Sequence, residues 1–494
     1  MRKLARIAGL IFFVALNISA VGAQQQPDQT QQPQQPQQPE EPQGQEQPIP
    51  AYKSPLASEA DNGNAANEPI QLAPDTSPLT GIQDLSLGVP LDRHSYWQPH
   101  AGLGLTFDTE PPNSGTAGLT GFTTWTTVAG GVDLYRYTGN SELSFQYLGG
   151  GIFSTNGSLG AGNLQDANLE AQFTFRRWTL MLIDELRYTP EISFGSSGFI
   201  GIPSPLPVPI GLSDSLGVDQ TILSEFGQRL TNTSGGQINL LLSPHSSLTF
   251  VGAFSELYFI DQALLNSTEF FADAGYNFQL NKYDTIGLSY VFNAFRYANY
   301  PQAINTNSAL VSYGRRVTGR LAFKISAGPE FAQFQTSISG GVTGPVGVTS
   351  DLYLSISADL RYELERTALY ASYRHGVAGG SGVLAGAIGD TLLAGVTRQI
   401  SRTFSGDVNL GYARNSGLSV ALPGVSSLNG VYDYWTAGAH LTHPLGRTLH
   451  LFVGYDFQYQ NSNASFCSGT SCGGSYGRNL ATVGISWQAR PKAF

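Results

Sequence analysis

The side chains of this 494-residue chain that could do chemistry are ionisable residues at alternate positions of otherwise apolar segments. A period of two places such residues on one face of a β-strand and their apolar neighbours on the other. If the apolar face contacts lipid, the charged face lines a wet interior, where opposed carboxylates and guanidinium groups orient polar solutes and select ions. The candidate pore-lining residues are Glu142, Glu170, Arg176, Glu185, Arg187, Asp359, Arg361, Arg374, Asp407 and Asp456.

The two cysteines, Cys467 and Cys472, are the next candidates for chemistry. In an exported chain they meet an oxidising compartment, so we expect a disulfide that closes a short loop. Their spacing is not CxxC, and no neighbouring histidine supplies further ligands. We therefore expect no metal site, and nothing in the sequence indicates a cofactor.

Catalysis and nucleic-acid binding are both disfavoured. Of the seven histidines, none lies in a G-x-S-x-G or an H-E-x-x-H motif, so we expect no catalytic residues and a protein that is not an enzyme. The 26 Lys and Arg residues against 36 Asp and Glu give a net charge of -10. This balance leaves no basic surface that could neutralise phosphates, and we expect no nucleic-acid partner.

The N-terminal region divides into two parts by composition. Residues 1–23 combine three cations, an apolar stretch and small residues, which is typical of a secretory signal peptide. Residues 24–98 begin with a Gln/Pro-rich tract that has no apolar set to bury, and they predict a disordered periplasmic arm and linker. The later part of this region, from residue 51, is either a short periplasmic plug or further linker. No apolar stretch beyond the signal is long enough for a membrane-spanning helix.

The remaining residues, 99–494, repeat one pattern of alternating segments joined by turns. In 352–362 apolar residues alternate with Tyr, Ser, Asp and Arg, and the same period recurs in 169–176, 449–459 and 481–488. A soluble sandwich could also alternate, but segments near 12 residues exceed its usual strands and match tilted membrane crossings. Short turns alternate with longer loops along the chain. We therefore predict an all-β, transmembrane, antiparallel up-and-down β-barrel of about 16 to 18 strands.

These features resemble bacterial outer-membrane β-barrel proteins of porin type. The resemblance depends on the signal peptide, the repeated alternation, the loop asymmetry and the terminal Phe494, although Pro491 interrupts the last alternation. It implies a location in the cell outer membrane, contact with its lipid, and recognition by the outer-membrane assembly machinery. It also implies a channel for passive diffusion of small polar solutes or ions, with an oligomer possible. The alternative is a non-conducting barrel that is a partner or anchor in an envelope or polysaccharide-export assembly.

The longest connection, from Pro190 to about Leu230, is the third outer loop in our count of strands. The resemblance implies that this loop folds inward and narrows the channel. Asp214 and Asp219, the charged residues of its Pro-rich, apolar stretch 193–220, are then the constriction-loop candidates. A self-packed outward cap or a contact between subunits is the competing interpretation.

Overall fold

The computed structural model describes the residues that form the strands and their shorter connections. They are residues 79–81, 94–109, 123–154, 162–189, 229–260, 265–298, 302–336, 347–379, 386–418, 430–462 and 474–493. No helix long and apolar enough to cross a membrane is found in these ranges.

The described chain is built from β-strands, as the alternating pattern predicts. The strands are β1 (Tyr96–Asp108), β2 (Thr123–Thr138), β3 (Ser141–Ser154), β4 (Gly162–Thr174), β5 (Trp178–Thr189), β6 (Arg229–Ser243), β7 (Ser246–Phe259), β8 (Ser267–Gln279), β9 (Asp284–Tyr297), β10 (Gln302–Thr318), β11 (Leu321–Thr336), β12 (Gly347–Leu364), β13 (Thr367–Ala378), β14 (Ala387–Gln399), β15 (Ser405–Gly417), β16 (Val431–Pro444), β17 (Leu449–Ser462), β18 (Gly474–Gln488) and β19 (Lys492–Ala493).

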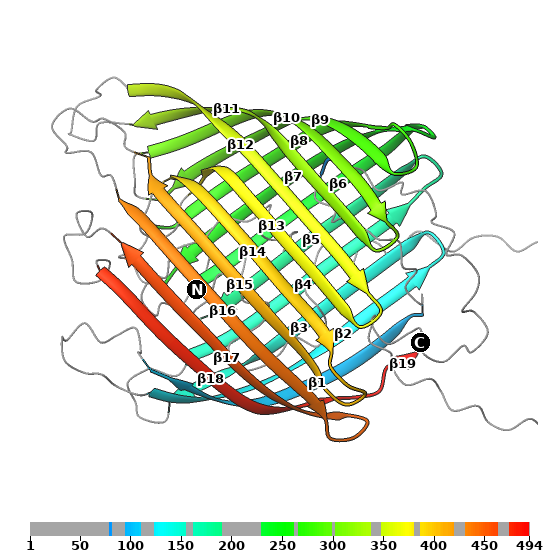
Figure 1. Ribbon diagram of the computed structural model, residues 1–494, viewed down its shortest axis with the longest axis vertical. Helices are drawn as coiled ribbons and strands as arrows, with labels where there is room; N and C mark the ends of the chain where they lie inside the picture. Colours follow the sequence, from blue (N-terminus) through cyan, green and yellow to red (C-terminus); the bar gives the residue numbers. More distant parts are fainter. Residues whose placement is uncertain are drawn as a thin grey trace, which may run out of the picture. The chain divides into compact units, whose positions relative to one another are not determined.

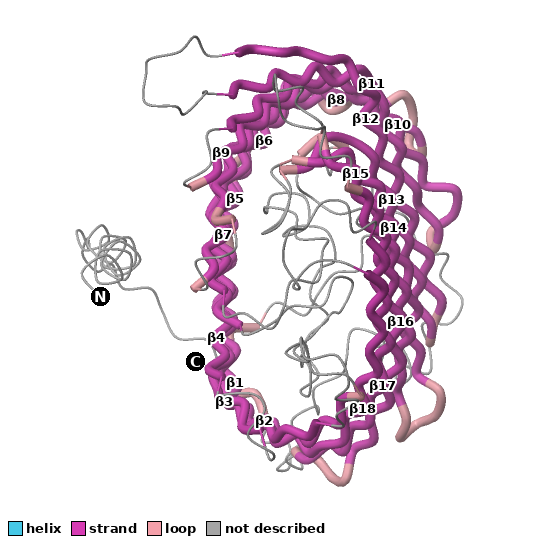
Figure 2. The backbone as a smooth tube through the Cα atoms, turned by 90° about the vertical axis from the view of Figure 1, so that its left-hand side faces the viewer, coloured by secondary structure: helices cyan, strands magenta, loops and turns pink. Residues whose placement is uncertain are grey.

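The strands form one closed ring, visible from the side in Figure 1 and from another direction in Figure 2. Each of the strands β1 to β18 pairs antiparallel with its neighbours in sequence, and β1 also pairs with β18. The two-residue strand β19 continues the closure against Tyr96 and Trp97 of β1. The prediction of an up-and-down barrel is confirmed, with eighteen crossing strands. Its first strand begins at Tyr96, slightly before the predicted boundary at residue 99.

Short and longer connections alternate around the ring. Because consecutive strands run in opposite directions, the connections that follow even-numbered strands share one end of the barrel. Gly139–Asn140 after β2 is a tight turn of this kind, and Gly139 adopts a left-handed φ of 36° that suits glycine. The structure adds two turns that the sequence pattern does not reveal, one between Thr174 and Trp178 and one between Thr318 and Leu321.

The outward face of the wall is apolar. Leu352 and Leu354 of β12 are 71% and 51% exposed, and the outward positions of the other strands carry similar side chains. Inward positions between them carry Ser, Thr, Asn, Gln and charged residues, among them Ser357 and Asp359 of β12. The alternation in 352–362 therefore separates an apolar outer surface from a polar interior, as predicted.

Acidic residues interrupt the outward apolar face at a few positions, and Asp184 is one of them. Asp184 of β5 lies on the same face of its strand as Leu182 and Leu186. Its carboxylate accepts hydrogen bonds from Asn232 Nδ2 at 3.3 Å and from Ser234 Oγ at 2.6 Å, both on β6. These bonds supply polar partners that an apolar environment would not.

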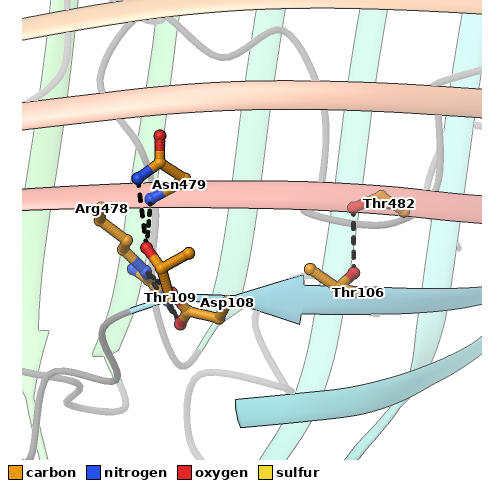
Figure 3. Close-up of polar contacts among 6 residues, drawn as sticks. All are labelled: Thr106, Asp108, Thr109, Arg478, Asn479 and Thr482. Atoms are coloured by element: carbon orange, nitrogen blue, oxygen red, sulfur yellow. Dashed lines mark hydrogen bonds and ion pairs between the residues drawn. The ribbon is translucent and has the colours of Figure 1, made fainter. Parts of the chain in front are cut away.

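The seam between the first and last crossing strands is held by a buried ion pair (Figure 3). Arg478 of β18 donates from Nε and Nη2 to Asp108 of β1 at 2.9 to 3.1 Å, and both side chains are fully buried. The guanidinium group lies 5.6 Å from the ring centre of Trp125 on β2. Nearby, the hydroxyl groups of Thr106 and Thr482 are 3.0 Å apart. The seam therefore has side-chain contacts in addition to its ladder of backbone bonds.

Candidate functional site

The interior face of the barrel carries the charged residues, and strands β3 to β5 supply one group. Register places Glu142, Glu170, Glu185 and Arg187 on the inward face of these strands. Arg187 bridges two acids, with Nη2 2.6 Å from Glu185 and Nε 3.3 Å from Asp166. The side chains of this bridge remain 19% to 25% exposed. Such partly exposed pairs are accessible to solutes and contribute little stability, about 0 to 1 kcal/mol each.

A second inward group lies on β11 to β13. Asp359 accepts a hydrogen bond from Ser372 Oγ at 2.8 Å and stands opposite Lys324 in the strand register. Arg361 Nε lies 2.6 Å from Glu363. Arg374, on the next strand, shares this inward face and is paired in register with Ser357. Here carboxylates and cations alternate over neighbouring strands, so this part of the wall presents both signs of charge.

A histidine between two aspartates forms the third group, on β15 to β17. His440 Nδ1 is 2.8 Å from Asp407 and its Nε2 is 3.3 Å from Asp456. Each ring nitrogen thus faces a carboxylate, and the two acids are held on either side of the ring. Both carboxylates are partly exposed, Asp407 at 38% and Asp456 at 19%.

The other predicted site residues fall elsewhere. Arg176 lies exposed in the turn between β4 and β5, so it is not on the inward face of a strand. Asp214 and Asp219, and the cysteines Cys467 and Cys472, lie outside the described residues. In the sequence, the connection that holds Asp214 and Asp219 follows β5 and precedes β6, as the count of strands predicted. Within the described ranges, no three His, Cys, Asp or Glu side chains form a group that could hold a metal ion.

Several inward charges were not among the predicted site residues, and strands β8 to β11 carry four of them. These are Glu269 and Asp273 on β8, and Lys324 and Glu330 on β11. A signal was present, since Phe323 and Ile325 flank Lys324 with the same period of two. Among the described inward positions acids outnumber cations, so this inner wall is acidic.

An apolar cluster, here called the mouth cluster, lies inside the barrel at the end with the longer connections. It consists of Phe295 and Tyr297 of β9, Ile304 of β10, Ala332 and Phe334 of β11, and Val377 of β13. Tyr353 and Leu418 pack against it. Apolar side chains at inward positions exclude water there, so the inner wall is less polar at this end.

The mouth cluster forms because β13 leaves the wall. Strand β12 runs from Gly347 to Leu364, but β13 pairs with it only from Ile356 onward. The end of β13 instead contacts the inward faces of β11 and β9. There the backbone N–H of Val377 donates to Glu330 Oε2 at 3.0 Å, and the hydroxyl of Tyr297 donates to the carbonyl of Gly379. The first bond satisfies a backbone N–H that β12 does not pair, and the second adds a side-chain donor to a carbonyl that also accepts from the backbone N–H of Gly386.

Close packing continues on β14. A Cβ atom at Gly386, which has a left-handed φ of 87°, would lie 2.2 Å from Ile304 Cδ1. A Cβ at Gly379 would lie 2.4 Å from the ring of Phe295. Glycine at both positions therefore permits the ends of β13 and β14 to contact β9 and β10 across the interior.

Comparison with known proteins gives matches in structure only. No protein-family model matches the chain, and no curated protein matches it in sequence. Among solved structures, OccK2 (OpdF) of Pseudomonas aeruginosa in complex with glucuronate is 10% identical, with 80% of this chain and 98% of that one covered and a TM-score of 0.37. OpdQ of the same organism is 11% identical, with coverage of 80% and 99% and a TM-score of 0.39. The FrpB iron transporter of Neisseria meningitidis is 9% identical, with coverage of 81% and 82% and a TM-score of 0.37. Identities and TM-scores this low support no transfer of function to this chain.

Proposed function

We propose that this chain is an outer-membrane channel for passive diffusion of small polar solutes or ions. The observation that supports the proposal best is the separation of a mainly apolar outer face from a mainly polar inner face in a closed ring of eighteen strands. Large apolar side chains are exposed around the outside, whereas partly exposed charges line the inside. A soluble barrel would cover its surface with charge, but a lipid bilayer favours this inverted arrangement.

Outward tyrosines support the membrane location. Their rings lie on the apolar face while their hydroxyl groups donate to neighbouring polar side chains, an arrangement that suits the boundary between lipid and water. The pairs are Tyr147 with Gln165, Tyr290 with Asn307, Tyr373 with Asp390, Tyr412 with Asp433 and Tyr455 with Asn479.

Ring size and charge support conduction and its selectivity. Barrels of about 8 strands are filled by their own side chains, whereas those of about 16 to 18 strands leave an aqueous lumen. The inward acids outnumber the inward cations here, and the pairs measured above remain partly exposed to water. An acidic, wet wall attracts cations and raises their local concentration. We therefore propose a channel that prefers cationic or neutral polar solutes over anions.

The test is conductance of the refolded full-length chain in planar lipid bilayers under a salt gradient. We expect discrete conductance steps and a reversal potential of the sign that indicates cation preference. A heat-unfolded sample of the same chain is the matched control and should give no steps. A folded barrel without conductance would refute the channel and favour the alternative, a non-conducting anchor for an envelope assembly.

A further inference from the structure

Three residues that precede the barrel lie inside it. Leu79, Thr80 and Gly81, here called the docked segment, contact the inner face of β6 to β10. Leu79 is 7% exposed and Thr80 is 3% exposed, as buried as residues of a protein core. The contacts lie close to the short turns, since Asn277 is near the end of β8. The docked segment therefore occupies the wall at the opposite end from the mouth cluster.

Asn277 of β8 binds the docked segment through both ends of its amide. Its Oδ1 accepts from the backbone N–H groups of Leu79 at 3.0 Å and of Thr80 at 2.9 Å. Its Nδ2 donates to Thr80 Oγ1 at 2.8 Å and to Thr249 Oγ1 on β7 at 3.2 Å. A strand pairs such backbone groups with another strand, so here one side chain substitutes for a backbone partner.

Three glycines on adjacent strands make room for the docked segment. A Cβ atom at Gly275 of β8 would lie 2.2 Å from Thr80 Oγ1, and one at Gly287 of β9 would lie 2.9 Å from Thr80 Cγ2. A Cβ at Gly314 of β10 would lie 2.4 Å from Leu79 Cδ1. Glycine weakens a strand because it has no side chain to pack, and it commonly marks the place where another backbone approaches closely. Three of them against Leu79 and Thr80 indicate a surface shaped for this segment.

The last residue of the docked segment is fitted with equal closeness. Gly81 has a left-handed φ of 100°, and a Cβ there would lie 2.4 Å from Gln237 Oε1 and 2.7 Å from Thr249 Cγ2. Its backbone N–H donates to the carboxylate of Asp273. A residue with a side chain would meet both backbone strain and a collision at this position.

We propose that this part of the wall is an internal docking site that holds the docked segment and so narrows the lumen near its short-turn end. The part that concerns conductance rests on the proposed channel. The site recognises a short peptide by its backbone N–H groups, by a small hydroxyl side chain and by a glycine. Because the docked segment is joined to β1, and β1 is eight strands from β9 in the ring, the site fixes the chain to a distant part of the wall.

The experiment measures access to the docked segment directly. In a full-length chain with Cys467→Ser, Cys472→Ser and Thr80→Cys, a small charged thiosulfonate reports how fast position 80 is labelled. Gly275→Val fills the floor of the site, and we expect it to raise the labelling rate by about tenfold or more, the factor for loss of one or two hydrogen bonds. Gly252→Val on β7 is the matched control, because nothing lies within 4 Å of a Cβ there. Equal rates in the two folded variants would overturn the docking site.

Conductance then tests whether docking narrows the lumen. Gly275→Val, on the wall, and Leu79→Asp, on the docked segment, should each raise single-channel conductance, and the double variant should rise no further because both release the same segment. Leu79 lies outside every strand, so we expect the Leu79→Asp variant to fold. Its conductance can then be measured even if the Gly275→Val variant does not fold. A wild-type barrel that does not conduct refutes the channel, while the labelling rates still decide the docking site. Release seen by labelling without any rise in conductance would overturn the narrowing.

Discussion

The buried ion pair at the seam provides the sharpest test of how the ring is held closed. Replacing Arg478 by Met would leave the carboxylate of Asp108 without its three short contacts, at a position with no exposure to solvent. It would also remove the cation that lies over Trp125. Breaking a buried pair in this way costs about 3 to 5 kcal/mol, because a charge remains buried and unpaired.

A second substitution and a control show whether the loss of stability comes from a buried unpaired charge or from removing any arginine. Asp108→Leu in the Arg478→Met background should recover much of the loss, since two apolar side chains need no charged partner. Arg187→Met removes an inward arginine whose pair with Glu185 is 25% and 19% exposed. We expect this control to cost about 1 kcal/mol or less.

The assay is guanidinium chloride unfolding of the barrel in detergent micelles, followed by tryptophan fluorescence and by the mobility of unheated samples. With a slope of about 5 kcal/mol per molar, the midpoint should fall by about 0.6 to 1 M for Arg478→Met and by about 0.2 M or less for Arg187→Met. If the two midpoints fall equally, the seam pair does not hold the ring and the reasoning from burial is wrong.

Three further predictions concern the faces and the mouth of the barrel. Leu354→Arg, on the outward face, should cost up to about 2 to 4 kcal/mol of assembly stability, whereas Ser355→Arg on the inward face should fold and shift ion selectivity; refolding yield and reversal potentials compare them. Asp456→Asn should weaken cation preference, and Asp390→Asn, on the outward face, should leave the reversal potential unchanged. Phe295→Ala should widen the lumen at the mouth cluster and raise single-channel conductance. An unchanged conductance would show that the mouth cluster does not limit the passage of ions.

Much of the fold was predictable because one physical requirement is repeated in every strand. Each crossing strand has to present an apolar face to lipid and a polar face to water. Apolar and polar residues therefore alternate within each strand, and this pattern can be read from a short stretch of sequence. The pairing of Leu360 with Phe323 and of Asp359 with Lys324 follows that period. The position of the loop between β5 and β6 also followed from counting. The pore-lining role of the inward charges stays a prediction, and Arg176 shows that a charge next to a turn can leave the pattern.

The contacts that the sequence did not reveal join residues far apart in the chain. Arg478 and Asp108 are 370 residues apart, and Asn277 and Leu79 are 198 residues apart. Period-two alternation carries no information about such partners, since it fixes only the face on which a side chain lies. The departure of β13 from β12 is of the same kind, because it depends on contacts with Ile304 and Phe295 across the interior. These contacts form only when the closed ring brings the distant strands together.

The closure of β1 against β18 and β19 has a consequence for the order of the strands. Tyr96 pairs with Ala493 and Trp97 with Lys492, so the two ends of the barrel sequence are neighbours in the same ladder. A chain rejoined there and opened instead at the turn after Thr138 would present the same ring of neighbours in a new order of synthesis. The order in which the strands are synthesised is therefore separate from the order in which they pair, because every strand of the closed ring has a neighbour on each side.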